Sequence, residues 1–287
     1  MNDALSPNPT TPPAGAAAPA SASVPSATPA NARIIAITSG KGDVGKTFVS
    51  ANLAAALTRR GHRVLVLDAD LGMANLDVVL NLHPKVTLHD VFTGKAQLED
   101  AVIKAPGGFS VLLAGSGMVE YSRLTPEVRN QFLSVIQALT PQYDVVLLDT
   151  GAGISDVVLF SVSLASEVLI VATPEPTSLT DAYAAIKVLA MQQQRQHVRM
   201  VINQAARPGD GRAITSQLQQ VLDRFVSTQS GRPVRLIHMG DIPADPSVRD
   251  AVMRRQLLLV NTPGCPAALA ISQLANKIET ALLTPTA

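Results

Sequence analysis

A glycine-rich stretch at residues 39–47 reads S-G-K-G-D-V-G-K-T. From Gly40 to Thr47 it fits the pattern G-x-x-x-x-G-K-[ST], in which backbone N–H groups surround phosphate oxygens. Lys46 would neutralise phosphate charge, and the Thr47 hydroxyl would bind Mg²⁺. The stretch follows a strand pattern and precedes a helix pattern, which favours a nucleotide phosphate loop over a glycine-rich turn without chemical function.

Two further segments place carboxylates directly after strand patterns. They read D-A-D-L-G-M-A-N-L-D at 68–77 and L-L-D-T-G-A-G-I-S-D at 147–156. At the carboxyl ends of adjacent parallel strands, these carboxylates would converge where Mg²⁺ and an attacking water need them. The alternative is that each aspartate only caps the next helix. Two strands that end in aspartate beside one phosphate loop favour a metal site over simple helix capping.

Short β-rich runs alternate with longer helical patterns from Arg33 onward. This alternation predicts an α/β fold with a mostly parallel, twisted sheet wrapped by helices on both faces, and a ligand crevice at the strands' carboxyl ends. We expect one domain over 33–287, without a repeat or a second domain. The expected strands are 33–38, 63–68, 109–114, 144–149, 168–172, 198–203 and 234–239, and the expected helices include 46–60, 125–140, 177–194 and 211–227.

Composition narrows the class of protein. A net charge of +1 disfavours nucleic acid and anionic lipid as general partners. The single cysteine, Cys265, excludes an internal disulfide and an iron–sulfur cluster held by one chain, and it favours the cytosol. Residues 1–32 hold 7 prolines, 10 alanines and one charged side chain, and so predict a disordered tail that is not a secretory signal.

The stretch S-G-K-G-x-V-G-K-T resembles the deviant Walker A motif of the MinD/ParA family of ATPases, which are P-loop NTPases. The resemblance implies that ATP and Mg²⁺ are the cofactors. It also implies that the extra lysine, Lys41, reaches across a dimer interface to the partner's nucleotide. An ATP-dependent homodimer is the expected consequence.

The same resemblance assigns roles to individual residues. Asp70 would orient or activate the attacking water, Asp68 and Asp149 would act through Mg²⁺ or its waters together with Thr47, and the Gly153 amide would approach the γ-phosphate. Asn203 and Pro243 resemble the adenine-contacting residues, although Asn203 could equally be a residue that ends a strand. The nucleotide-binding residues of the loop would be Gly40, Lys41, Gly42, Val44, Gly45, Lys46, Thr47 and Phe48.

The residues in and between the motifs are most similar to those of the flagellar branch of the family, the FlhG/FleN/YlxH group. D-A-D-L-G-M-A-N-L-D-V-V-L-N-L and L-L-D-T-G-A-G-I-S-D-V-V-L-F carry this resemblance, together with T-L-H-D-V-F-T-G. It implies control of flagellar number or placement, with an SRP-type GTPase and a flagellar transcription activator as partners. The branch's N-terminal D-Q-A-x-x-L-R activator helix has no counterpart in the tail, which puts stimulation of such a GTPase in doubt.

The C-terminal segment 271–283 places apolar residues on one helical face, as a membrane-surface helix would. Its charges, Lys277 and Glu279, cancel, whereas a membrane-surface helix should be basic. We therefore expect this helix to pack on the domain. The expected location is the cytoplasm, with at most a weak peripheral contact with the inner membrane.

Asp43 stands where the family has glycine. A carboxylate about 5 Å from a phosphate charge would cost about 3 kcal/mol at an effective dielectric constant of about 20. Aspartate tolerates positive φ, and its charge could face solvent or pair with Lys41. Three alternatives remain open: a nucleotide-impaired scaffold, a ParA-type partition ATPase, and a P-loop kinase or ligase acting on a small molecule.

Overall fold

The computed structural model describes residues 1, 32–71, 75–115 and 123–284. Apart from Met1 and Ala32, the tail expected at 1–32 lies outside the described residues, as do residues 72–74 of the segment 68–77.

The described strands form one eight-stranded sheet in the order β3-β4-β2-β5-β1-β6-β7-β8. β3 is antiparallel to β4, and every other pair is parallel. The mostly parallel sheet and all seven expected strands are therefore confirmed, and the short edge strand β3 was missed. The strands are β1 (Arg33–Ser39), β2 (Val64–Ala69), β3 (Val102–Lys104), β4 (Ser110–Leu112), β5 (Val145–Ala152), β6 (Glu167–Ala172), β7 (His197–Ala205) and β8 (Arg235–Pro243).

The helices include the four that were expected and several shorter ones. The expected ones are α1 (Lys46–Arg59), α5 (Pro126–Leu139), α7 (Pro176–Gln193) and α8 (Asp210–Leu222), the last continuing into the π-helical turn η3 (Asp223–Ser227). The others are α2 (Leu76–Leu80), α3 (Leu88–Phe92), α4 (Leu98–Ala101), η2 (Thr140–Gln142), α6 (Asp156–Ser163), α9 (Thr228–Ser230), α10 (Pro246–Met253), α11 (Leu258–Asn261), α12 (Pro266–Ile278) and η4 (Glu279–Leu283).

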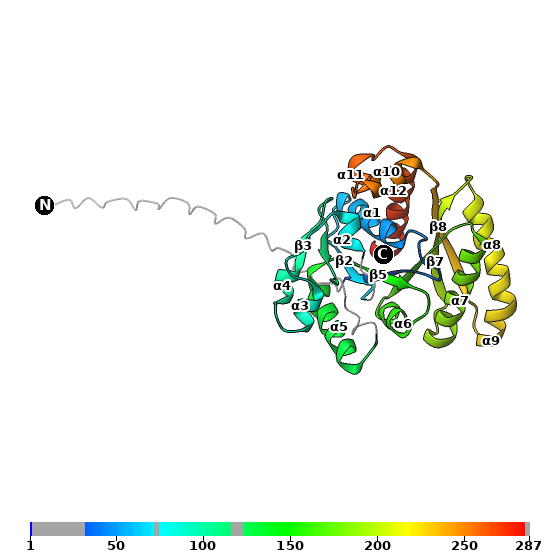
Figure 1. Ribbon diagram of the computed structural model, residues 1–287, viewed down its shortest axis with the longest axis horizontal. Helices are drawn as coiled ribbons and strands as arrows, with labels where there is room; N and C mark the ends of the chain where they lie inside the picture. Colours follow the sequence, from blue (N-terminus) through cyan, green and yellow to red (C-terminus); the bar gives the residue numbers. More distant parts are fainter. Residues whose placement is uncertain (2–31, 72–74, 116–122, 285–287) are drawn as a thin grey trace.

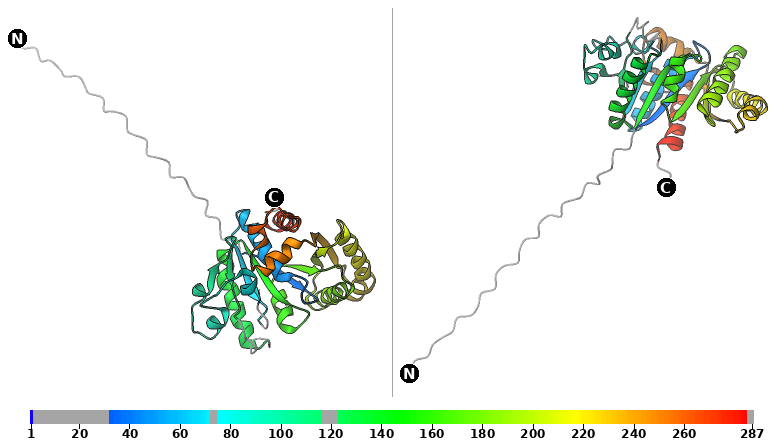
Figure 2. Two further views of the ribbon diagram at one scale, coloured as in Figure 1. Left: turned by 45° about the horizontal axis from the view of Figure 1, so that its top comes forward. Right: turned by 90° about the horizontal axis from the view of Figure 1, so that it is seen from below.

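Helices cover both faces of the sheet, so the strands are apolar on both sides (Figures 1 and 2). One core layer joins the sheet to α5, α6, α7 and α8, and the other joins it to α1, α10, α11 and α12. Neighbouring residues of a strand serve opposite layers: in β1, Ala36 belongs to the first core and Ile37 to the second. Because the strands around β1 are parallel, their carboxyl ends meet at one edge of the sheet.

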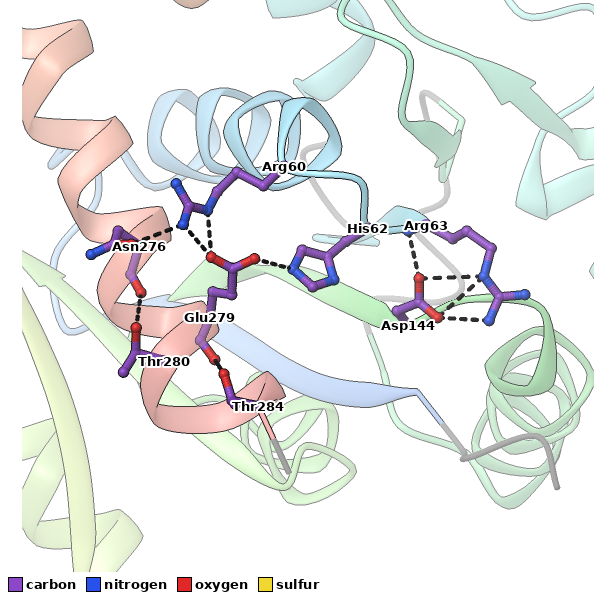
Figure 3. Close-up of polar contacts among 8 residues, drawn as sticks. All are labelled: Arg60, His62, Arg63, Asp144, Asn276, Glu279, Thr280 and Thr284. Carbon is purple, nitrogen blue, oxygen red and sulfur yellow. Dashed lines mark hydrogen bonds and ion pairs between the residues drawn. The ribbon is translucent and has the colours of Figure 1, made fainter. Parts of the chain in front are cut away.

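The C-terminal helix packs on this domain, as expected. Its apolar stripe is buried, from Ile271 to Leu282. Polar contacts link its last turn to the end of α1 (Figure 3). Arg60 donates to Glu279 and, over 2.8 Å, to the side-chain oxygen of Asn276. The His62 ring lies 2.8 Å from Glu279. Within the described ranges, no helix is both long and apolar enough to cross a bilayer.

Candidate nucleotide-binding site

The phosphate loop connects β1 to α1 and depends on two glycines. Gly45 precedes α1 with φ +92°, and a Cβ there would lie 2.4 Å from the side-chain nitrogen of Asn203. A Cβ on Gly40 would lie 2.1 Å from the main-chain carbonyl of Asp181. Both positions therefore exclude a side chain, and the backbone N–H groups of the loop stay open to phosphate oxygens.

Asn203 reaches the loop from the end of β7. It is buried, and its side-chain nitrogen donates to the Val44 carbonyl over 2.9 Å. This hydrogen bond gives Asn203 a clear structural function in holding the loop. A cavity of about 480 Å³ lies beside it and is lined by Phe48, Asn203 and Pro243, among others. The cavity has room for a base, and contact of Asn203 and Pro243 with adenine stays a prediction.

The two expected carboxylates come together because their strands are neighbours. Asp68 of β2 and Asp149 of β5 are register partners, and both are buried. Ser50 of α1 donates to Asp149 over 2.8 Å, and Thr47 also hydrogen-bonds this carboxylate. Burial raises the pKa of Asp149 to about 6, although the hydrogen bonds from Thr47 and Ser50 act to lower it. Burial and the nearby Asp149 raise the pKa of Asp68 well above its usual value.

The oxygens at this point suit a hard divalent cation. One oxygen of Asp68 accepts from the Asp70 amide over 3.2 Å, and the other is buried without a hydrogen-bond partner among the described residues. A buried carboxylate oxygen that lacks a donor is a candidate metal ligand or a partner for a metal-bound water. The Asp68, Asp149 and Thr47 oxygens therefore fit Mg²⁺.

Lys46 lies among these acids. Burial lowers the pKa of its ammonium group, whereas Asp149, Asp70 and Asp43, in decreasing order, raise it. A cation held between carboxylates and the phosphate loop is placed to neutralise phosphate charge. The expected function of Lys46 agrees with this position.

Asp70 follows β2 and lies beside the carboxyl end of β5. A Cβ on Gly151 of β5 would be 3.3 Å from an Asp70 side-chain oxygen. Gly153, directly after β5, has φ +86° and donates its amide to the Ser39 carbonyl over 2.8 Å. Contact of this amide with a γ-phosphate would require the hydrogen bond to be exchanged, so that assignment stays a prediction.

Lys41 turns away from this group. Its ammonium donates to Glu175 (2.8 Å), which immediately precedes α7, and to the hydroxyl of Thr177 (3.1 Å) in the first turn of α7. The side chains of Lys41 and Glu175 are 37% and 61% exposed, so the pair lies at the surface. The Lys41 ammonium thus contacts Glu175 and Thr177, and its contact with a nucleotide stays a prediction.

Asp43 has φ +60°, as the tolerance of aspartate for this conformation allows, and it is exposed. Its pairing with Lys41 does not form, because Lys41 binds Glu175 instead. Within the described ranges, no lysine or arginine lies within ion-pair distance of Asp43. Solvent therefore screens the negative charge of the Asp43 carboxylate.

Three contacting residues were not anticipated. Ser50 lies one helical turn after Thr47, a spacing that could have identified it as a second donor to Asp149. Glu175 and Thr177 follow β6 at the same edge of the sheet as the other site residues, and this placement is the signal that could have identified them.

A phosphate loop between the first strand and helix of a parallel sheet, with carboxylates on the adjacent strands, defines a P-loop NTPase. The family model described as "ParA: NUBPL iron-transfer P-loop NTPase" matches residues 31–279. The chain is 42% identical over 247 residues to the antiactivator FleN of Pseudomonas aeruginosa, with 86% of each chain covered. It is 31% identical over 258 residues to the flagellum site-determining protein YlxH of Helicobacter pylori, covering 88% of this chain and 85% of that one.

A similar solved structure is the cell division ATPase MinD of Pyrococcus furiosus, with a TM-score of 0.71, 31% identity, and coverage of 87% of this chain and 99% of that one. MinD of Pyrococcus horikoshii, solved with Mg-ADP, has a TM-score of 0.70, 29% identity and coverage of 87% and 97%. The chain belongs to the ParA/MinD family of P-loop NTPases and is related to the flagellar regulators FleN and YlxH.

Proposed function

We propose that the chain is a switch ATPase that dimerises when it binds ATP, hydrolyses the ATP with Mg²⁺, and thereby regulates flagellar number or placement. The observation that carries the proposal is the position of the two loop lysines. Lys46 lies among Asp149, Asp70 and the loop, whereas Lys41 lies at the surface with Glu175. Lys46 would serve the chain's own nucleotide, and Lys41 would be available to a partner's nucleotide.

The chain's own residues would divide the chemistry between them. Thr47, Asp68 and Asp149 would hold Mg²⁺ or its waters, and the ion would neutralise charge on the phosphates. Asp70, next to Gly151, would orient the attacking water. A carboxylate with this function affects turnover more than ground-state binding.

Partners and location follow from the relatives. FleN is named an antiactivator and YlxH a flagellum site-determining protein, which supports a flagellar transcription activator or an SRP-type flagellar GTPase as partner. We place the protein in the cytoplasm, with at most a weak contact with the inner membrane, because the apolar stripe of α12 is used in the core. The proposal includes one ATPase domain over 33–287 and a disordered tail over 1–32.

A nucleotide-impaired scaffold is less well supported than an ATPase. The glycines of the loop keep the shape that phosphate binding needs, and Asp43 is exposed rather than turned into the buried carboxylate pair. A partition ATPase or a small-molecule kinase stays an alternative, and neither has a specific observation in its favour.

Asp70→Ala tests the switch. We expect the variant to bind ATP and to form the dimer, but to hydrolyse ATP at least tenfold more slowly, so that the dimer persists. Solution mass and phosphate release would be measured beside wild type and beside Asp100→Ala, a change at an exposed residue of α4. Normal turnover by Asp70→Ala would refute its assignment as the water-orienting residue, and a wild-type protein that stays monomeric with ATP would refute the switch.

A further inference from the structure

A second cavity lies at the open edge of the sheet. β8 is the last strand, so one of its edges has no neighbouring strand, while α8 packs beside one face and α12 beside the other (Figure 1). The cavity between them measures about 730 Å³, which is within the usual range for small-molecule sites. It is lined by the loop that follows β7 and by residues of α8, β8 and α12.

Three cations from three different elements line this cavity. Arg207 comes from the loop before α8, Arg212 from α8, and Lys277 from α12. In the described part of the chain, none of them has a carboxylate within ion-pair distance. Two of them, Lys277 and Arg212, lie near His238: burial lowers the pKa of this imidazole most, Asp241 raises it, and Lys277 and Arg212 lower it further.

The acidic residue of the cavity, Asp241, is hydrogen-bonded through one of its two oxygens. That oxygen accepts from the amides of Gly209 and Gly211 at the start of α8, each over 3.3 Å. The other oxygen lies 3.2 Å from the His238 ring and has no hydrogen-bond partner among the described residues. The Asp241 carboxylate therefore stabilises the amino end of α8, and the three cations remain for a ligand.

The remaining wall of the cavity is apolar. Leu269, although apolar, is 51% exposed, and Ala270 is half-buried beside it on α12. The other apolar lining residues are Ala205, Ala206, Pro208, Pro243 and Pro266. Such a wall suits a flat or aliphatic ligand body, whereas the cations suit a phosphate group, which arginine binds through paired donors.

We propose that this cavity binds an organic phosphate with an apolar body, at a site separate from the phosphate loop. No residue of the loop 40–47 lines it, and Pro243 is the residue that it shares with the cavity beside Asn203. The site is therefore distinct from the cavity beside the phosphate loop.

The edge of β8 is a poorer site for an added peptide strand. The register between β7 and β8 shifts after Met200, and Gly240 has φ +147° at that point. A bulge of this kind interrupts the regular row of main-chain groups that strand addition needs. The local geometry thus favours a compact ligand.

The test uses 1-naphthyl phosphate as probe, titrated into the full chain by calorimetry with and without saturating Mg-ADP. We expect one site per chain, with the same affinity in both conditions to within about threefold. Inorganic phosphate and 1-naphthol, which each lack one half of the probe, should bind at least tenfold more weakly. Loss of the probe when Mg-ADP is added would show that it binds the phosphate loop, and would overturn the proposal.

Variants locate the site independently of ATP binding or dimerisation. Arg212→Gln and Lys277→Gln, both at exposed positions, should each weaken probe binding at least fivefold, while Arg59→Gln, at the exposed end of α1, should leave it unchanged. Circular dichroism and thermal melting would show that all three variants are folded. No binding by wild type, or equal binding by wild type and both cavity variants, would overturn the proposal.

Discussion

Replacing Asp43 by glycine is expected to tighten ATP binding about threefold to tenfold. Asp43 is exposed, yet its charge reaches the Lys46 ammonium, so its carboxylate also acts on phosphates in the loop. At about 6 Å and an effective dielectric constant of about 40 to 80, suited to an exposed side chain, repulsion of one phosphate charge costs about 0.7 to 1.4 kcal/mol. This range gives the expected change in affinity.

A second substitution separates charge from backbone conformation. Asparagine removes the charge of Asp43 and, like aspartate, tolerates the observed φ of +60°. Asp43→Asn should therefore recover most of the gain shown by Asp43→Gly. If glycine helps and asparagine does not, the handicap is conformational rather than electrostatic.

The assay is calorimetric titration of each variant with a non-hydrolysable ATP analogue and Mg²⁺, at about 0.05 M and 0.5 M salt. The gap between variant and wild type should narrow at the higher ionic strength, because salt screens an exposed charge. Asp100→Asn, an exposed aspartate of α4, is the matched control. Unchanged affinity in both Asp43 variants would refute the reasoning, since the carboxylate would then not act on the phosphates.

Two further predictions concern ion pairs. Glu175→Gln should strengthen the ATP-dependent dimer by up to about fivefold in a sedimentation experiment, because it releases Lys41 from an exposed pair worth up to about 1 kcal/mol; a weaker dimer would show that Glu175 supports the interface instead. Glu279→Gln should lower the free energy of unfolding in urea by about 0.5 to 1 kcal/mol at pH 7, with Glu99→Gln as an exposed control. Arg60 lowers the pKa of Glu279 from 4.5, so the stabilisation is present above that pH and is lost as the pH falls through the lower folded-state value. A difference that did not shrink as the pH was lowered from 4.5 would refute this cause.

The pattern of apolar runs predicted most of the sheet, because strands covered on both faces are continuously apolar. Val145 to Leu148 in β5 are all fully buried, two on each face. β3 was not predicted because it has only three residues and lies at the edge of the sheet, where none of its residues is buried. A strand that short carries too little periodicity to distinguish it from a loop.

The site was predictable where it follows from strand order and was not where it follows from side-chain packing. Asp68 and Asp149 had to meet once their strands were adjacent and parallel. The bond from Asn203 to Val44 joins residues 159 positions apart, and that from Lys41 to Glu175 joins residues 134 apart. No local pattern specifies such partners, because they depend on where separate loops lie after the sheet has formed.

The central claim, that the two loop lysines serve opposite sides of a dimer, is tested most directly by comparing Lys41→Ala with Lys46→Ala. Nucleotide affinity and solution mass would be measured on the same samples with a non-hydrolysable ATP analogue and Mg²⁺. We predict that Lys46→Ala loses nucleotide binding, whereas Lys41→Ala binds nucleotide as a monomer and does not form the dimer that wild type forms. Equal loss of nucleotide binding in both variants, or a normal dimer in Lys41→Ala, would contradict the account.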